Sequence, residues 1–112
     1  MKIISNRVSV RELRETSQGM IDNTVKAVVD VEKGIMAVDG LHADEEALLI
    51  QHGSARKNLW GINIYLDLTE DGFVGFDSAI NCRPSLGNRS RNVDDRKIQR
   101  EIIKIVNGLI EK

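Results

Sequence analysis

The sequence has few of the residues that cross-link or interrupt protein chains, with one cysteine, Cys82, and one proline among 112 residues. A lone cysteine cannot form an intramolecular disulfide or a zinc site of four thiolates, so a disulfide scaffold is excluded and the cytoplasm is the expected compartment. No apolar run approaches the roughly 20 residues of a membrane-spanning helix. The first residues also lack the apolar core of a secretory signal peptide, so we expect no membrane association.

The sequence also lacks an excess of one charge, and it has few aromatic side chains. Sixteen basic residues nearly balance seventeen acidic ones, and the net charge of −1 removes any general attraction to nucleic acid, which is therefore not expected as a partner. Aromatic residues make up 4% of the chain, and their places in strand-like runs fit core packing better than a base-stacking platform. Hydrophobic residues at 41% and charged residues at 29% are typical of a soluble globular domain, here a single one over residues 1–112.

Hydrophobic periodicity and turn residues predict the secondary structure. Strands are predicted over residues 2–5, 25–31, 35–38, 60–66 and 73–80, and helices over residues 10–21, 42–52 and 98–110. Ser9 and Glu12 form a capping box at the start of the first helix, and Asn92 or Asp94 is the expected N-cap of the last.

The resulting β-α-β-β-α-β-β-α order specifies an α+β fold. We expect a sheet of about five largely antiparallel strands, with the helices mainly on one face. The pattern does not determine the order of the strands in the sheet. An open edge or face of such a sheet needs covering, which makes a homodimer a reasonable expectation.

The segment at residues 81–92, called the basic loop below, is the most unusual part of the chain. From residue 83 to residue 100, six basic residues stand against two acidic ones, opposite in sign to the whole protein. Arginines offer forked donors, and a loop of Gly, Asn and Ser before a helix offers backbone N–H groups, so the loop suits a phosphate or carboxylate. The candidate ligand-binding residues are Asn81, Arg83, Ser85, Gly87, Asn88, Arg89, Ser90 and Arg91.

These residues also have a purely structural interpretation. The arginines can pair with acidic segments while Asn and Ser side chains cap backbone groups within the loop. The segment matches neither of the glycine-rich phosphate-binding motifs, G-x-x-x-x-G-K-[ST] and G-x-G-x-x-G. We expect a binding module for an anionic, phosphate-bearing small molecule, with the structural interpretation as its main competitor.

Two other functions stay open at this point. In the first, the protein is an enzyme whose arginines orient a substrate while Asp30, Asp39 or His42 acts as acid or base. In the second, it is a structural homo-oligomer that uses the basic loop as its interface. Cys82 lacks a neighbouring histidine in the sequence and is expected to be a small core residue rather than a nucleophile.

Acidic residues cluster over residues 30–46, where six carboxylates accompany one lysine. Oxygen ligands for a divalent cation are therefore available. However, Asp39, His42 and Asp44 match neither an EF-hand loop nor a His-x-x-x-His pair, so no metal and no cofactor are expected. The carboxylates at residues 44–46 instead suit the first turn of the second helix, where they complement its dipole.

Four segments resemble a known family. They are Val25–Gly34 (VKAVVDVEKG), Leu41–Asp44 (LHAD), Leu59–Asn63 (LWGIN) and Arg83–Ser90 (RPSLGNRS). The resemblance spans residues 25–110 and is to a family of small prokaryotic proteins catalogued as a domain of unknown function. It implies a prokaryotic, cytoplasmic, single-domain protein, and it brings no catalytic residue, cofactor or partner.

Overall fold

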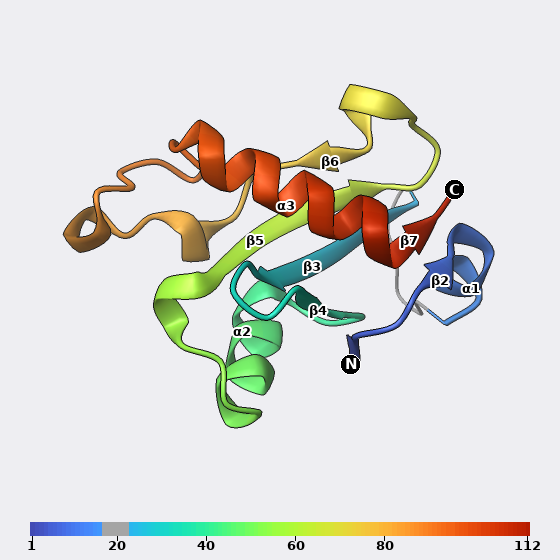
Figure 1. The fold of residues 1–112 in the computed structure, drawn as a ribbon, viewed down its shortest axis with the longest axis horizontal. Coiled ribbons are helices and arrows are strands. Elements are labelled where there is room, and N and C mark those ends of the chain that lie inside the picture. The colour runs from blue at the N-terminus through green and yellow to red at the C-terminus, as the bar shows by residue number, and fades with distance from the viewer. Residues whose placement is uncertain (17–22) are drawn as a thin grey trace.

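A five-stranded antiparallel sheet lies at the centre of the computed structural model, which describes residues 1–16 and 23–112 (Figure 1). The strands are β1 (Lys2–Ile4), β3 (Thr24–Asp30), β4 (Ile35–Val38), β5 (Leu59–Tyr65) and β6 (Val74–Gly75). Their order across the sheet is β1-β4-β3-β5-β6, and every neighbouring pair is antiparallel. The predicted α+β class, the strand number and the antiparallel pairing are confirmed.

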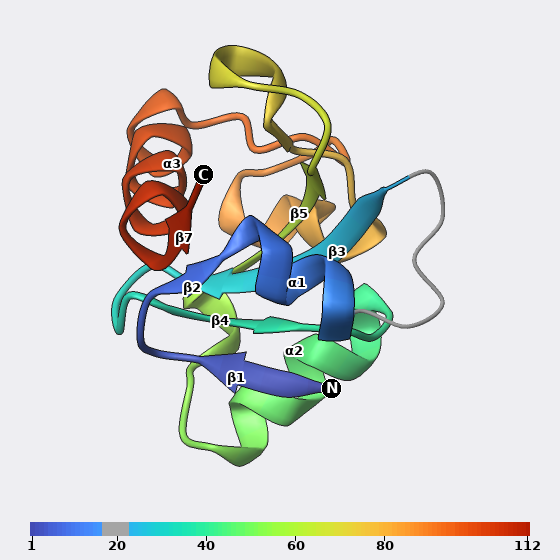
Figure 2. The ribbon, with the colours of Figure 1, turned by 90° about the vertical axis from the view of Figure 1, so that its right-hand side faces the viewer.

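Both faces of this sheet are covered. Along β3, Val25, Ala27 and Val29 point to one face and Val28 to the other, as the alternation of a buried strand requires. Helices α1 (Val10–Thr16) and α3 (Arg96–Leu109) pack on the first face, and α2 (His42–Gln51) packs on the second (Figure 2). Two of the three helices thus share a face, while α2 alone covers the opposite one.

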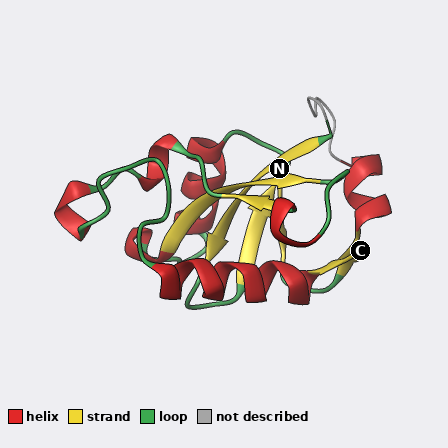
Figure 3. Cartoon of the chain, turned by 90° about the horizontal axis from the view of Figure 1, so that it is seen from above, coloured by secondary structure: helices red, strands yellow, loops and turns green. Residues whose placement is uncertain are grey.

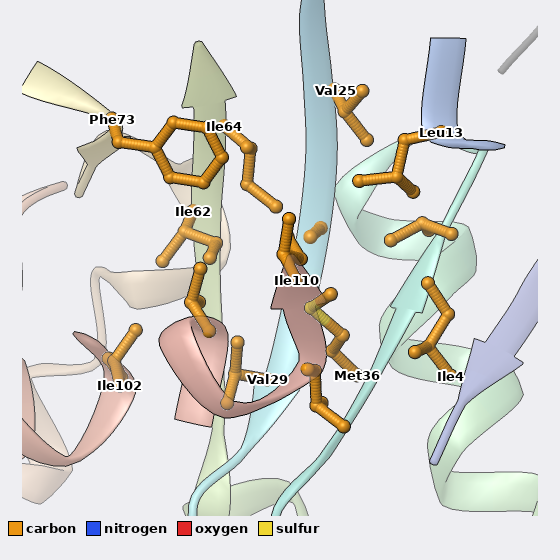
Figure 4. Close-up of a cluster of buried hydrophobic side chains, with 14 of the residues drawn as sticks. Ile4, Leu13, Val25, Val29, Met36, Ile62, Ile64, Phe73, Ile102 and Ile110 are labelled. Carbon is orange, nitrogen blue, oxygen red and sulfur yellow. The ribbon is translucent and has the colours of Figure 1, made fainter. Parts of the chain in front are cut away.

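Helix α3 contributes the largest apolar stripe to the core. Ile102 and Val106 are fully buried, and Ile102 lies in the cluster that also holds Ile62, Val29 and Met36 (Figure 4). Its N-cap is Asp95, whose side chain accepts a hydrogen bond from Lys97 N at 2.8 Å. The expectation of Asn92 or Asp94 as the cap was therefore wrong, and the cap is the residue after Asp94. No helix within the described ranges is long and apolar enough to cross a membrane.

The N-terminal region combines a confirmed prediction with a missed element. Ser9 Oγ accepts a hydrogen bond from Glu12 N at 3.0 Å and Ser9 N donates to Glu12 Oε1 at 3.5 Å, which confirms the capping box. The predicted continuation of this helix through residues 17–21 lies outside the described residues. Strands β2 (Val8–Ser9) and β7 (Ile110–Glu111) form a short parallel pair that joins the two ends of the chain. Two-residue strands have no periodicity, so the sequence does not reveal them.

The strand predicted over residues 73–80 is much shorter in the structure. Only Val74 and Gly75 pair with β5, and the chain then turns away from the sheet. Ser78 begins a short 3₁₀ helix over Ala79–Asn81, because its side chain caps Ile80 N at 3.4 Å. From there the basic loop extends away from the sheet at one end of the molecule (Figure 1 and Figure 3).

Candidate functional site

The basic loop is held together by two buried asparagines. The Asn81 side chain exchanges hydrogen bonds with both backbone groups of Gly61, donating at 2.9 Å and accepting at 2.8 Å. The Asn88 side chain donates to the carbonyls of Asn81 and Asn92 at 2.7 Å each and accepts from Asp94 N at 2.8 Å. The Asn81 amide therefore ties the loop to β5, and the Asn88 amide satisfies backbone groups within the loop and at its end. Neither is free to bind a ligand.

Other candidate residues of the loop also serve its local structure. Gly87 has φ +84°, the left-handed conformation that glycine adopts without strain, and it ends the turn that begins at Arg83. The Ser90 hydroxyl donates to the Asp94 carboxylate at 2.6 Å. Ser85 is exposed and has no hydrogen bond from its side chain to any described residue. The structural interpretation therefore accounts for much of this segment.

Arg83 anchors the loop to the body of the protein. Its guanidinium donates to the carbonyls of Arg56 at 2.6 Å and Leu59 at 2.7 Å, and it lies 4.4 Å from the centre of the Trp60 ring. Partial burial lowers the pKa of Arg83 from its ordinary value. Its two terminal amino groups bond to carbonyls of the body of the protein, and its buried Nε has no hydrogen-bond partner among the described residues, so Arg83 is a structural contact in this conformation.

Arg91 differs from the other loop arginines because it lines an open hollow. This hollow, called the Arg91 hollow below, has a volume of about 410 Å³ and is lined by Phe76, Asp77, Arg91 and Asn92. Ser78 N donates to the carbonyl of Arg91 at 3.0 Å, so the segment after β6 and the end of the basic loop run side by side. Arg89 is exposed, and within residues 1–16 and 23–112 its side chain has no ion-pair partner.

A single ion pair crosses the Arg91 hollow. Arg91 Nε donates to Asp77 Oδ1 at 2.7 Å, and the two side chains are 60% and 68% exposed. Among the described residues, the two terminal amino groups of Arg91 have no further partner. Exposed pairs of this kind contribute about 1 kcal/mol or less to stability. The pair therefore orients the guanidinium only weakly, and most of the donors of Arg91 stay available.

His42 and Ser78 form a hydrogen-bonded pair next to the segment that lines the hollow. Since a carbonyl only accepts, His42 Nε2 carries a proton and donates to the carbonyl of Ile62 at 2.7 Å, while the Ser78 hydroxyl donates to Nδ1 at 2.8 Å. Burial lowers the pKa of His42, and the charges of Lys26 and Arg91 lower it further, so the ring is neutral at pH 7. Both ring nitrogens are occupied, and Ser78 is 1% exposed.

Two features of β5 set the position of the segment that follows β6. Gly61 permits the close approach of Ser78, because a Cβ at this position would lie 2.5 Å from Ser78 Oγ. Asn63 Nδ2 donates to the carbonyl of Asp77 at 3.0 Å, while its buried Oδ1 has no hydrogen-bond partner among the described residues. Lys26 is the cross-strand neighbour of Asn63. The polar residues of this end of the sheet thus converge on the base of the hollow.

The sequence did not reveal most of this site. Its residues come from β5, the start of α2, the segment after β6 and the end of the basic loop, and His42 and Ser78 are 36 positions apart. Phe76, expected as a core or cross-strand residue, is half-buried and lines the hollow. No spacing rule connects residues from four separate elements, so only the fold brings them together.

The other residues proposed for acid-base chemistry lie elsewhere. Asp30 is buried and caps the β3–β4 hairpin, accepting from Ser54 Oγ at 2.6 Å and from Glu32 N at 2.9 Å. Asp39 has φ +68° in the turn before α2. The charge of Arg91 acts on the pKa of His42, which places His42 near the hollow.

The expected burial of Cys82 was wrong, because Cys82 is exposed rather than a core residue and its Sγ lies 3.5 Å from the carbonyl of Arg89. Glu45 lies in the first turn of α2, as expected, but its side chain is fully buried. Burial at both positions depends on how the 3₁₀ turns and α2 pack on the sheet.

Fold and site together define a small α+β protein with an open hollow at one end of its central sheet. The chain belongs to the family described as "Protein of unknown function (DUF5674)", which matches residues 2–109. No curated protein and no solved structure matches the chain. The family membership agrees with the resemblance expected from the sequence.

Proposed function

We propose that this protein is a binding module for a small phosphate-bearing molecule and that the Arg91 hollow receives the anionic group. The observation that carries the proposal is the position of Arg91 at the hollow, with its Nε bonded to Asp77 and its terminal amino groups without another partner among the described residues. A planar guanidinium in this position presents a fork of donors that matches two oxygens of one phosphate. The proposal thus assigns the main role to Arg91 rather than to the whole loop.

The charges around the hollow support this assignment. Lys26 and Arg91 both act on His42, and Asp77 is the carboxylate that opposes them there. A phosphate approaching Arg91 competes only with the exposed Arg91–Asp77 pair, which is weak in water. The volume of about 410 Å³ falls within the usual range for small-molecule sites.

The same geometry supports catalysis less well. His42 is engaged at both nitrogens and Ser78 is buried, so neither offers a free group to a substrate in this conformation. Asp30 and Asp39 act in turns away from the hollow. Binding is therefore the function that the arrangement of these residues supports best.

A titration with pyrophosphate tests the proposal. Heteronuclear NMR of the labelled protein should show saturable shifts at residues 76–78 and 91–92, and the affinity should fall with added salt. Arg91→Gln should weaken binding about tenfold, since a charge-assisted contact contributes about 1.5 to 3 kcal/mol. The matched control is Arg100→Gln, on the exposed side of α3, which should leave the affinity unchanged.

Two outcomes would overturn the proposal. One is an absence of saturable shifts with pyrophosphate, and the other is an equal loss of affinity in both arginine variants. A change of molecular mass of Arg91→Gln in solution, with unaltered pyrophosphate affinity, would instead identify the basic loop as an interface between copies of the chain.

A further inference from the structure

The lining of the Arg91 hollow offers more than a phosphate site requires. Phe76 contributes an aromatic ring that packs against the core on one side and lines the hollow on the other. Asp77 contributes a carboxylate, which accepts hydrogen bonds and donates none. Asn92 adds a polar backbone and amide at the rim. An inorganic anion or a plain phosphosugar has no flat ring of its own to pack against Phe76.

We infer that the ligand of the Arg91 hollow is a nucleoside monophosphate, an inference that rests on the proposed phosphate-binding function. The phosphate lies on the terminal amino groups of Arg91, the base packs against Phe76, and the sugar hydroxyls donate to Asp77. A nucleoside monophosphate combines an anion, vicinal hydroxyl donors and a flat ring in one molecule. These three groups match the guanidinium, the carboxylate and the aromatic ring of the hollow.

The arrangement of the ion pair fits this assignment. Arg91 Nε and Asp77 Oδ1 are 2.7 Å apart, while the terminal amino groups of Arg91 and the second carboxylate oxygen of Asp77 have no further partner among the described residues. A phosphate and a sugar hydroxyl can therefore each bond to one of these groups while the pair remains. Phe76 and Asp77 are consecutive residues of the segment after β6, and the bond from Asn63 Nδ2 to the Asp77 carbonyl fixes that segment. The aromatic wall and the carboxylate are thus presented by one restrained stretch of backbone.

A comparison of three ligands on the wild-type protein, namely AMP, ribose 5-phosphate and pyrophosphate, together with one analogue of AMP, tests the inference. AMP should bind about tenfold more tightly than ribose 5-phosphate, since stacking of a base on an aromatic ring contributes about this much. Pyrophosphate should bind no more tightly than AMP. The adenine protons of bound AMP should shift upfield because they lie over the Phe76 ring. The 2′,3′-dideoxy analogue of AMP should bind about fivefold more weakly than AMP, because it lacks the donors for Asp77.

Variants then test whether Phe76 causes the preference for AMP over ribose 5-phosphate. Phe76→Leu should remove the advantage of AMP over ribose 5-phosphate while the affinity for ribose 5-phosphate stays the same. Leu86→Ala, at an exposed apolar residue of the same loop region, should leave both affinities unchanged. If Phe76→Leu does not fold, the upfield shift of the adenine protons on the wild-type protein still decides the matter.

The outcomes distinguish the nucleotide inference from the proposed phosphate binding. Equal affinity for AMP and ribose 5-phosphate, both weakened by Arg91→Gln, would overturn the nucleotide assignment and leave phosphate binding intact. Failure of all three ligands to bind would overturn both.

Discussion

Glu45 in α2 provides a sharp test of how burial controls charge in this protein. Its side chain is fully buried, Oε2 accepts from Gly40 N at 3.1 Å, and Oε1 has no hydrogen-bond partner within the described part of the chain. Burial raises the pKa of Glu45 to about 9 from its usual 4.5, which outweighs the bond from Gly40 and the attraction of Lys26. The favourable interaction of a charged carboxylate with the helix dipole in the first turn contributes less than about 1 kcal/mol and does not reverse the rise in pKa.

The sign of the effect on stability follows from the raised pKa. The folded protein binds a proton at Glu45 that the unfolded chain releases above pH 4.5, so stability is fully present below that pH and is lost as the pH rises toward 9. Keeping the carboxyl protonated costs about 1 kcal/mol at pH 5 and about 3 kcal/mol at pH 7. Glu45→Gln carries no proton to lose, and its amide oxygen can still accept from Gly40 N. The unfolding free energy of the variant, relative to that of the parent protein, should therefore increase as the pH rises.

Urea unfolding at pH 5, 7 and 8.5 measures this gain. The difference in unfolding free energy between Glu45→Gln and the parent should grow with pH, and effects of other groups such as His42 cancel in that difference. Glu101→Gln, at an exposed position of α3, is the matched control and should show a small difference that does not vary with pH. A Glu45→Gln variant that is less stable than the parent at pH 8.5 would refute the reasoning, because it would show that Glu45 is charged and stabilising.

Four further predictions concern the core, the hollow and the lone thiol. Ile102→Ala should lower the unfolding free energy by about 2 to 5 kcal/mol, and a loss below 1 kcal/mol would show that α3 is not part of the core. Gly61→Ala should cost about 1 to 3 kcal/mol in urea unfolding because the new Cβ meets Ser78 Oγ, and an unchanged midpoint would contradict the close approach. Asp77→Asn should raise the affinity for inorganic phosphate about threefold by freeing Arg91, whereas weaker binding would show that Asp77 does not oppose the anion. Cys82 should react with a thiol reagent almost as fast in the native protein as in urea, and strong protection would place it in the core.

Strong periodicity explains why much of the fold was predictable. The apolar stripe of α3 and the alternation in β3 and β5 each repeat over several residues, so they specify both the element and its buried face. The capping box at Ser9 was predictable because it is a local signal, which depends on residues only three positions apart. Sheet order and the short β2–β7 pair depend on contacts between distant segments, which periodicity does not encode.

The candidate site shows where residue types alone mislead. The basic loop was identified correctly as a distinctive segment, but the same donors that suit an anion also suit backbone carbonyls. In the structure Asn81, Arg83 and Asn88 bond to main-chain groups, and only the folded structure distinguishes these from Arg91. The hydrogen bonds that link His42 at the start of α2 to the Ile62 carbonyl and to Ser78 join three separate elements and have no sequence signature.

A crystal structure of the protein grown with saturating AMP tests the central claim most directly. The proposed function predicts a phosphate group in the Arg91 hollow, with its oxygens within hydrogen-bond distance of the terminal amino groups of Arg91, and the nucleotide inference places the adenine against Phe76. A phosphate bound at another face of the molecule, or an empty hollow with Arg91 still paired only to Asp77, would contradict the assignment of this site.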